Sequence, residues 1–260
     1  MKVEVVKTLE FCSGDPLRNS DHRIVMFSDS HMGDRSKADN FDEKAFKWFL
    51  SNVVKANDVL VGLGDITDIW ESSHVMFRAY AGLLKDLYKN PNFVYVVGNH
   101  DMQLSKYAPV FCVHKYCSDG ILGVHGNDAD IFNSKFSFIG AIATKFNATL
   151  ERLFGRGLDH IDRKSKKINS LKTPAQLSDQ EFGRVKHNYW SYMSSLIDGN
   201  DSVFMGVFGH THRLEIITQG TTNFRGKKVK KIMVNCGDFV GTNSFVLIHR
   251  NHCALCRVVK

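Results

Sequence analysis

Short apolar runs of strand length recur along the chain, and helical patterns lie between the early ones. The runs that predict strands are residues 23–27, 58–63, 93–97, 121–124, 203–208, 231–235, 244–249 and 254–259. Between 46 and 54, and again between 76 and 87, apolar residues recur at helical spacing. This alternation predicts α/β layering around a central sheet. The later strands have short connections, which indicates that their half of the fold is antiparallel or mixed.

The stretch 141–199 differs from this pattern. It contains an apolar group at Phe146, Leu150, Leu153 and Phe154, then a basic run at 163–167 and an aromatic group around Tyr189. We expect a helical insertion over the sheet edge, within a single domain that spans residues 1–260. A lid over a substrate and a purely structural helical subdomain are both compatible with its composition.

Composition narrows the class of protein. The 260 residues are 43% hydrophobic and 23% charged, which is ordinary for a globular domain. No apolar run reaches the roughly 18 residues of a transmembrane helix, and the first residues lack the long apolar stretch of a secretory signal. The six cysteines are irregularly spaced, and the pair Cys253 and Cys256 lies in an alternating strand, so we interpret them as structural. A cytoplasmic location is therefore expected.

The formal net charge of +7 has two interpretations. It describes either an ordinary basic surface or an attraction to anionic substrates, nucleic acid or an acidic membrane surface. The basic stretch 225–231 is interpreted first as a solvated hairpin, with phosphate or membrane contact as the alternative. Charge alone does not choose between these partners.

Five polar clusters follow predicted strands. They are Ser28-Asp29-Ser30-His31, Gly64-Asp65-Ile66-Thr67-Asp68, Gly98-Asn99-His100-Asp101, His125-Gly126-Asn127-Asp128 and Gly209-His210-Thr211-His212. Ligands of α/β sheets collect beyond the carboxyl ends of strands, and glycines there permit tight turns. The i, i+2 spacing within the first and last clusters would direct both side chains to one side of an extended chain. Carboxylates mixed with imidazoles suit Mn, Fe or Zn, so the pattern predicts a metal centre.

The clusters resemble the D-x-H, G-D-x-x-D, G-N-H-D/E, H and G-H-x-H motifs of the calcineurin-like metallophosphoesterase superfamily, from about Arg23 to the C-terminus. The resemblance implies a four-layer αββα sandwich of two mixed sheets, with the metals at one sheet edge. It also implies two divalent metal ions, with Mn as the first choice and Fe or Zn as alternatives. The implied reaction is hydrolysis of a phosphodiester or pyrophosphate bond by a metal-bound hydroxide, in which two metals about 3.5–4 Å apart share an oxygen ligand.

The resemblance also assigns individual roles. It implies Asp29, His31 and His212 as ligands of the first metal, Asp65 as the bridging carboxylate, Asn99, His125 and His210 as ligands of the second metal, His100 as the histidine that assists the leaving group, and Asp68 as the acid that orients it. Asp101 and Asp128 either support the ligands from behind or are turn residues, and the turn interpretation is preferred.

A narrower resemblance rests on residues 232–240, which follow the G-H-T-H-R sequence, and on the long insertion. Both are similar to the branch that contains UDP-2,3-diacylglucosamine pyrophosphohydrolase. That branch implies a lipid-linked pyrophosphate substrate, and its helical insertion shelters acyl chains. The chain departs from the branch at His100, where Arg is typical, and at Asn127, where Asp is typical. The chain therefore resembles a relative of that enzyme in the broader branch, rather than the enzyme itself.

These features leave several functions open. The expected substrate is a phosphorylated small molecule or a lipid-linked one, the latter with peripheral contact at the inner membrane surface. A nuclease or a cyclic-nucleotide phosphodiesterase is the alternative enzyme. A phosphoprotein phosphatase is disfavoured because no Arg-Gly follows Asp68, and a non-catalytic scaffold is disfavoured because the ligand set is complete.

Overall fold

The computed structural model describes residues 1–10, 22–35, 39–69, 75–107, 112–130 and 178–260. Its first sheet has six strands in the order β1 (Lys2–Glu10), β11 (His252–Val259), β10 (Ser244–His249), β2 (Ile24–Phe27), β3 (Val59–Leu63) and β4 (Phe93–Val96). The strands β2, β3 and β4 are parallel, whereas β10 runs antiparallel to β2 and both β1 and β10 run antiparallel to β11.

The second sheet has five strands in the order β5 (Tyr116–Ser118), β6 (Ile121–Gly123), β7 (Met205–Phe208), β9 (Lys227–Cys236) and β8 (Leu214–Phe224). Strands β6, β7 and β9 are parallel, and β5 and β8 flank them antiparallel. Both sheets are therefore mixed.

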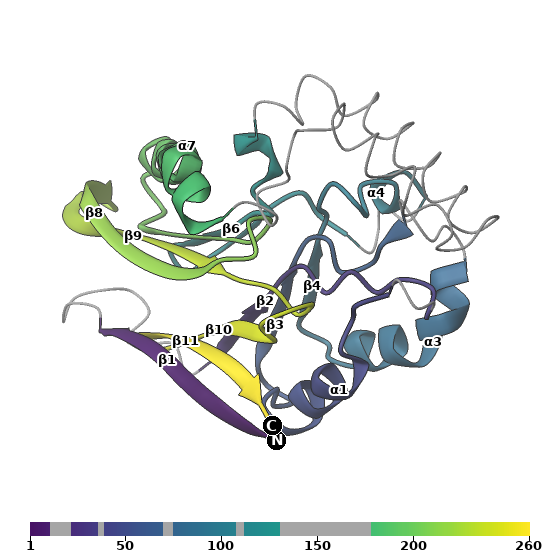
Figure 1. Cartoon of the computed structure of the whole chain (residues 1–260). Coiled ribbons are helices and arrows are strands. Elements are labelled where there is room, and N and C mark those ends of the chain that lie inside the picture. Colours follow the sequence, from purple (N-terminus) through teal and green to yellow (C-terminus); the bar gives the residue numbers. More distant parts are fainter. Residues whose placement is uncertain (11–21, 36–38, 70–74, 108–111, 131–177) are drawn as a thin grey trace, which may run out of the picture.

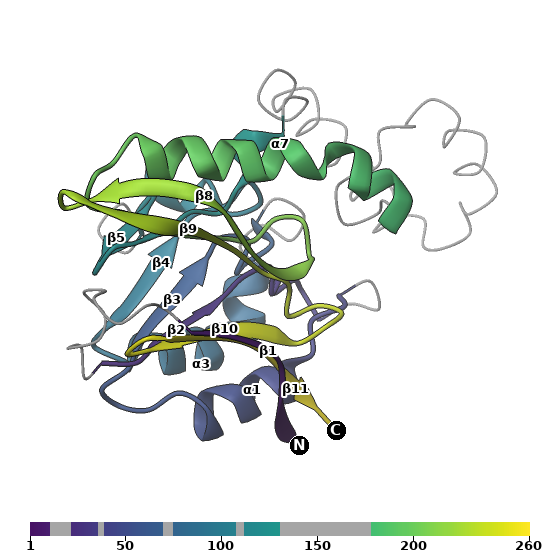
Figure 2. The same cartoon turned by 90° about the vertical axis from the view of Figure 1, so that its left-hand side faces the viewer.

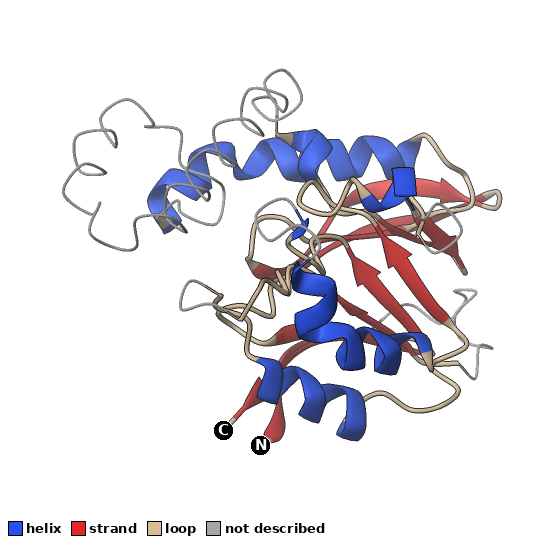
Figure 3. Ribbon diagram, turned by 90° about the vertical axis from the view of Figure 1, so that its right-hand side faces the viewer, coloured by secondary structure: helices blue, strands red, loops and turns tan. Residues whose placement is uncertain are grey.

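Helices cover the outer faces of the two sheets. The helices α1 (Glu43–Asn52) and α3 (Val75–Tyr88) lie below the first sheet, and α7 (Asp179–Asp198) crosses the second (Figures 1 and 2). Figure 3 shows the strands between these two helical layers. The expected α/β sandwich of two mixed sheets is confirmed. Two short helices, α4 (Leu104–Tyr107) and η2 (Asn127–Ala129), lie in the connections.

Strand β2 shows why the sequence produces these layers. Its residues Ile24 and Met26 face the core between the sheets, while Val25 and Phe27 face the core under the helices. A strand buried on both faces needs an uninterrupted apolar run, and this one is apolar throughout. Its carboxyl end is thereby fixed in the interior, directly before the first polar cluster.

The helices are fixed by their ends and by their apolar faces. The Asp42 side chain caps α1 by accepting from the backbone N–H of Ala45 at 2.9 Å. A reciprocal capping box between Ser178 and Glu181 begins α7. The buried face of α7 packs on the second sheet, and it includes Tyr189, Trp190, Met193 and Ile197.

The predicted strands are all present, with ends shifted by a few residues, but three strands were not predicted. Strand β1 is exposed along nearly its whole length, and β8 is largely polar with a register shift between Thr218 and Thr221, so neither carries a clean apolar alternation. Strand β5 has only three residues. The hairpin expected at 225–231 is present as the β8–β9 turn.

Within the predicted insertion 141–199, residues 141–177 lie outside the described residues, and α7 forms the remainder. The single-domain boundary and the lid stay predictions. Cys253 and Cys256 are free and buried in β11, where they pack as apolar residues. Among the described residues, no helix is long and apolar enough to cross a membrane.

Candidate metal centre

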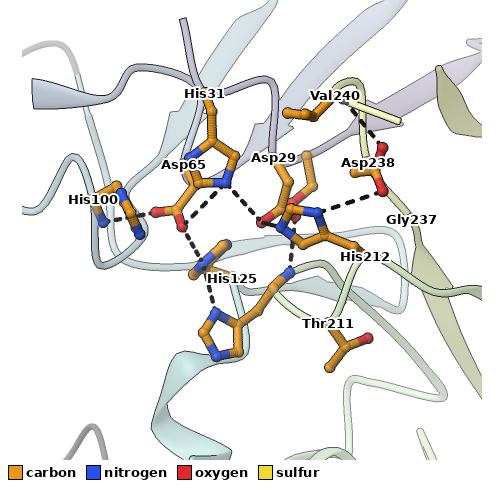
Figure 4. A network of polar contacts seen from close by, with 12 residues as sticks. Asp29, His31, Asp65, His100, His125, Thr211, His212, Gly237, Asp238 and Val240 are labelled. Carbon is orange, nitrogen blue, oxygen red and sulfur yellow. Dashed lines mark hydrogen bonds and ion pairs between the residues drawn. The ribbon is translucent and has the colours of Figure 1, made fainter. Parts of the chain in front are cut away.

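The five polar clusters converge at the carboxyl ends of five strands. The first three follow β2, β3 and β4 of one sheet, and the last two follow β6 and β7 of the other. The site therefore lies where the strand ends of both sheets meet, rather than at the edge of one sheet. Figure 4 shows the imidazoles and carboxylates directed toward one another.

One half of the centre is built around Asp29. Nε2 of His212 lies 3.3 Å from Oδ1 of Asp29, and Nε2 of His31 lies 3.8 Å from the same oxygen. This oxygen is buried and has no hydrogen-bond partner among the described residues. The other oxygen accepts from the backbone N–H of His210 at 2.8 Å and from the Ser28 hydroxyl. A buried carboxylate oxygen that faces two imidazoles without a hydrogen bond fits a cation position.

The other half is built around His125. Its Nε2 lies 3.2 Å from Oδ2 of Asp65, 3.2 Å from Oδ1 of Asn99 and 3.3 Å from Nδ1 of His210. Two imidazole nitrogens at this separation gain little from each other unless a proton or a cation lies between them. The donor set of one carboxylate, one amide oxygen and two imidazoles suits a divalent transition metal.

Asp65 lies between the halves. Its Oδ1 accepts from the backbone N–H of His100 at 2.8 Å. Its Oδ2 lies 3.9 Å from Nε2 of His31 and 3.2 Å from Nε2 of His125. One carboxylate oxygen is thus directed at a histidine of each half, as the bridging assignment requires.

The histidines also have acceptors at their rear nitrogens. Nδ1 of His125 donates to the carbonyl of Leu63 at 2.8 Å. Nδ1 of His212 lies 3.4 Å from Oδ2 of Asp238. Such contacts fix which nitrogen carries the proton and which one faces the centre.

His100 and Asp68 form a pair beside the centre. Nδ1 of His100 lies 3.1 Å from Oδ1 of Asp68, and both side chains are partly exposed. The His100 ring is perpendicular to the ring of His31, with centroids 4.7 Å apart. The structure therefore brings together all nine residues that the sequence singled out, while their roles as ligands and as acid stay predictions.

The backbone at the predicted ligands differs from the sequence expectation in one respect. The i, i+2 pairs were expected to lie in extended chain, but Asp29, His31, His210 and His212 all have positive φ, between 44° and 66°. Asp65 also has φ of 50°. Each such residue costs about 1 kcal/mol or more, which the surrounding structure must offset. The convergence of these side chains therefore comes from left-handed turns rather than from the alternation of a strand.

Close packing supports these turns. Backbone N–H groups of Asp29 and His31 donate to the carbonyls of Gly64 and Asp65, at 3.1 and 2.9 Å. A Cβ at Gly98 would lie 2.2 Å from Oδ1 of Asp65. Only glycine therefore fits beside the carboxylate that joins the halves.

Burial and opposite charge act against each other on the two carboxylates. Burial alone would raise the pKa of Asp29, but attraction to His212 and His125 holds it well below its usual value. At Asp65, burial would likewise raise the pKa, but attraction to His125 and His100 outweighs the effect of burial. The pKa of Asp65 is therefore lowered. Both groups are anionic at neutral pH.

The imidazoles respond in opposite directions. Burial would lower the pKa of His125 and of His212, but Asp65 raises the first to about 9 and Asp29 raises the second to about 10. At His210 burial prevails, with help from His125, and its pKa is lowered. In the metal-free protein, protons on His125 and His212 therefore stand where cations would bind.

Two further acidic residues of the motif loops make contacts around the centre. Asp101 is fully buried and accepts from the backbone of Gly98 and Ile66, at 2.5 and 2.9 Å, and from the Tyr95 hydroxyl at 2.7 Å. It ties the second and third motif loops together, and burial with nearby Asp65 raises its pKa to about 6. It is more than a turn residue. Asp128 accepts from the Tyr192 hydroxyl of α7 at 3.1 Å.

Asp130 and Asp238 were missed as site residues. Oδ2 of Asp130 lies 3.8 Å from Nε2 of His210, and Asp238 contacts His212. Asp130 follows the fourth cluster by two residues and gives no sequence signal of its own. Asp238 lies in the G-D-F-V sequence directly after β9. That sequence was noted for the branch resemblance but was not connected with a histidine.

Comparison with known proteins agrees with this geometry. The family model described as calcineurin-like phosphoesterase matches residues 22–214, and the chain belongs to that family. No curated protein matches the sequence.

Similar solved structures include a metallophosphoesterase from Sphaerobacter thermophilus, 13% identical over 93% of this chain and 89% of that one, with a TM-score of 0.44. A dimetal phosphatase from Danio rerio is 11% identical over 92% and 97%, with a TM-score of 0.46. Vps29 complexed with Zn²⁺ from Entamoeba histolytica is 14% identical over 86% and 84%, with a TM-score of 0.38.

Proposed function

We propose that this protein hydrolyses a phosphodiester or pyrophosphate bond at the metal centre, with His100 as the proton donor to the leaving group. Membership of the family implies a metal-dependent phosphoester hydrolase. The observation that carries the finer proposal is the His100–Asp68 pair, which lies beside the ligand histidine His31. A poor leaving group needs a proton as its bond breaks, and this pair is built to deliver one.

The described residues fit two divalent cations. Asp29, His31 and His212 would hold the first, Asn99, His125 and His210 would hold the second, and Asp65 would contact both. The buried Oδ1 of Asp29 has no hydrogen-bond partner within the described part of the chain, Nδ1 of His210 faces Nε2 of His125 at 3.3 Å, and the mixed N and O donors suit Mn, Fe or Zn. When bound, such cations lower the pKa of water and offset charge on phosphoryl oxygens.

The protein's own groups would then orient and protonate. Asp68 holds Nδ1 of His100, so the proton for the leaving oxygen would pass from Nε2. The backbone N–H of His100 donates to Oδ1 of Asp65, which couples the position of the acid to that of the shared carboxylate. Asp101 fixes the loops that carry both groups.

A lipid-linked pyrophosphate such as UDP-2,3-diacylglucosamine is the substrate we propose first. The sequence at 232–240 and the insertion support it, and α7 lies beside the centre. The Tyr189 ring lies 6.3 Å from the ring of His210, and the Tyr192 hydroxyl contacts Asp128. A cytoplasmic protein in peripheral contact with the inner membrane surface would meet such a substrate.

A nuclease or cyclic-nucleotide phosphodiesterase is the second candidate, favoured by the net charge of +7. Four exposed cations surround the β8–β9 turn: Arg225, Lys227, Lys228 and Lys230. Such a cluster would attract a polyanion. Nucleic acid digestion that weakens when these cations are removed would favour this candidate over the lipid substrate.

Substrate assays on Mn-loaded protein test the proposal. We expect hydrolysis of bis-p-nitrophenyl phosphate and faster hydrolysis of UDP-2,3-diacylglucosamine, both lost in the Asp65→Asn variant. Single-stranded DNA and a cyclic nucleotide are assayed beside them. A protein that holds two metals yet hydrolyses none of these would contradict the proposal.

The lid has a separate test. Leu150 and Phe154 lie outside the described residues, and replacing both by Ser should leave the small diester unaffected but reduce activity on the lipid-linked substrate, because remote contacts position the reacting phosphorus. Equal activity of the folded double variant and the parent on both substrates would exclude a lid.

A further inference from the structure

The end of β9 and the turn that follows it contact the metal centre in three places. The amide of Asn235 donates to the hydroxyl of Thr211, which lies between the two histidines of the G-H-T-H sequence. The backbone N–H of Phe239 donates to the carbonyl of Asp29 at 3.2 Å. Asp238 contacts the His212 ring (Figure 4). This segment thus contacts Asp29 and His212, two of the proposed ligands of the first metal, and also Thr211 between the two histidines.

Asp238 organises this turn through one of its two carboxylate oxygens. Its Oδ1 accepts from the backbone N–H groups of Val240, Gly241 and Thr242, at 3.1, 2.6 and 2.8 Å. The side chain is nearly fully buried, at 6% relative exposure. Three donors on a single oxygen fix the plane of the carboxylate, because turning that plane would leave these N–H groups without their acceptor.

Gly237 and Ser244, on either side of the turn, hold it in place. Gly237 has φ of 71°, and a Cβ there would lie 2.1 Å from the Ser244 hydroxyl. That hydroxyl accepts from the backbone N–H of Asp238 at 3.0 Å and donates to the carbonyl of Cys236 at 2.9 Å. The position of the Asp238 side chain is therefore set by the turn, independently of the histidine that it contacts.

Because Oδ1 of Asp238 accepts the hydrogen bonds of the turn, Oδ2 is the oxygen that faces His212. It lies 3.4 Å from Nδ1, while Nε2 on the opposite side of the ring lies 3.3 Å from Oδ1 of Asp29. A carboxylate oxygen can only accept, so it selects the ring form that carries a proton on Nδ1 and a lone pair on Nε2.

We infer that Asp238 is a positioning residue for the first metal: its carboxylate, held rigid by the 238–242 turn, keeps the Nδ1 proton of His212 and thereby directs the Nε2 lone pair at the Asp29 half of the centre. The inference rests on the proposed function, because it assumes a cation between Asp29, His31 and His212. The second half has a different arrangement, in which the backbone carbonyl of Leu63 accepts the hydrogen bond from Nδ1 of His125.

The nearly isosteric change Asp238→Asn reverses this preference without removing the turn. The three backbone N–H groups require an oxygen at the Oδ1 position, so the new amide must place its NH₂ group toward His212. That group donates to Nδ1 and forces the ring proton onto Nε2, where it opposes a cation. We therefore expect a selective loss of the first metal.

Zinc titration against a competing chromophoric chelator measures both affinities, in the parent, in Asp238→Asn and in Asp86→Asn as a matched control. Asp86 is a surface carboxylate paired only with Lys89 among the described residues. We expect Asp238→Asn to weaken one of the two zinc sites by about 10–100-fold, the range for partners behind a ligand histidine. The other site, the far-ultraviolet circular dichroism and the Asp86→Asn protein should match the parent.

Long-range ¹H–¹⁵N spectra of the zinc-loaded parent give a second readout that needs no variant. We expect the His212 proton on Nδ1, and a proton on Nε2 would overturn the inference. Parental zinc affinity at both sites of Asp238→Asn would overturn it, and so would equal weakening of both sites. A parent that binds no zinc at this centre would instead count against the proposed function.

Discussion

Oδ2 of Asp65 lies 3.2 Å from Nε2 of His125, while the backbone N–H of His100 holds the other oxygen of the same carboxylate at 2.8 Å. Because this N–H holds Oδ1, the plane of the carboxylate is fixed. Oδ2 is thereby fixed as the atom that also faces His31 of the other half. The position of this carboxylate oxygen between His31 and His125 is thus a property of the fold that exists before any cation binds.

Replacing Asp65 by Asn should weaken both metal sites together. The amide would place an NH₂ group on one side of the centre and remove the negative charge from both halves. The loss should exceed the about 10–100-fold typical of a residue behind a ligand. Isothermal titration with Mn²⁺ measures it, with Asp29→Asn as the matched variant that should weaken one site more than the other. Unequal loss in the Asp65→Asn protein would contradict the bridge.

Replacing His100 by Ala should retain both metals but reduce kcat by about 10²–10⁴-fold for substrates with poor leaving groups. The loss should be smaller for p-nitrophenyl esters, whose leaving group needs little protonation. Asp68→Asn should show the same dependence on the leaving group with a smaller loss, because the ring would be less well held. His187→Ala, an exposed histidine of α7, is the control. Equal losses for good and poor leaving groups would refute the acid role.

The sequence predicted the site better than it predicted the backbone that builds it. The predicted ligands follow buried apolar strands, and this signal is strong because both faces of strands such as β2 are covered. The left-handed turns at Asp29 and His210 were not predicted, because neither residue type requires positive φ. Asp238 was missed as a partner because its contact with His212 joins segments that only the tertiary fold brings together.

Metal binding should release protons at neutral pH. Asp65 raises the pKa of His125 to about 9, and Asp29 raises the pKa of His212 to about 10. Both rings are therefore protonated in the metal-free protein at pH 7. Since a ligand imidazole must be neutral, we expect about two protons released per chain and an affinity that rises with pH. Calorimetry in buffers of different ionisation enthalpy measures the number. Binding without proton release would contradict the assignment of these histidines.

The same shifts predict the sign of a stability change. The folded-state pKa values of His125 and His212 lie above the ordinary value of 6.5, so their contribution is complete below about pH 6.5 and is lost as pH rises through 9 to 10. The metal-free protein should therefore lose stability over this range, whereas the metal-loaded protein should not. Urea unfolding at several pH values separates the two.

Helix α7 should behave as part of the core. Trp190 is buried against Phe208, with ring centroids 5.1 Å apart, so Trp190→Ala should lower the free energy of unfolding by about 3–5 kcal/mol. Gly183→Ala on the same helix is the control, because a Cβ there meets nothing within 4 Å and should stabilise the helix by up to about 1 kcal/mol. A loss below about 1 kcal/mol for Trp190→Ala would mean that α7 is dispensable for folding.

The central claim is a centre of two metals joined by Asp65, and anomalous diffraction from crystals of the Mn-loaded protein tests it most directly. We predict two anomalous peaks, one beside Asp29, His31 and His212 and the other beside Asn99, His125 and His210, with Asp65 in contact with both. A single peak, or peaks that lie away from these seven residues, would contradict the account.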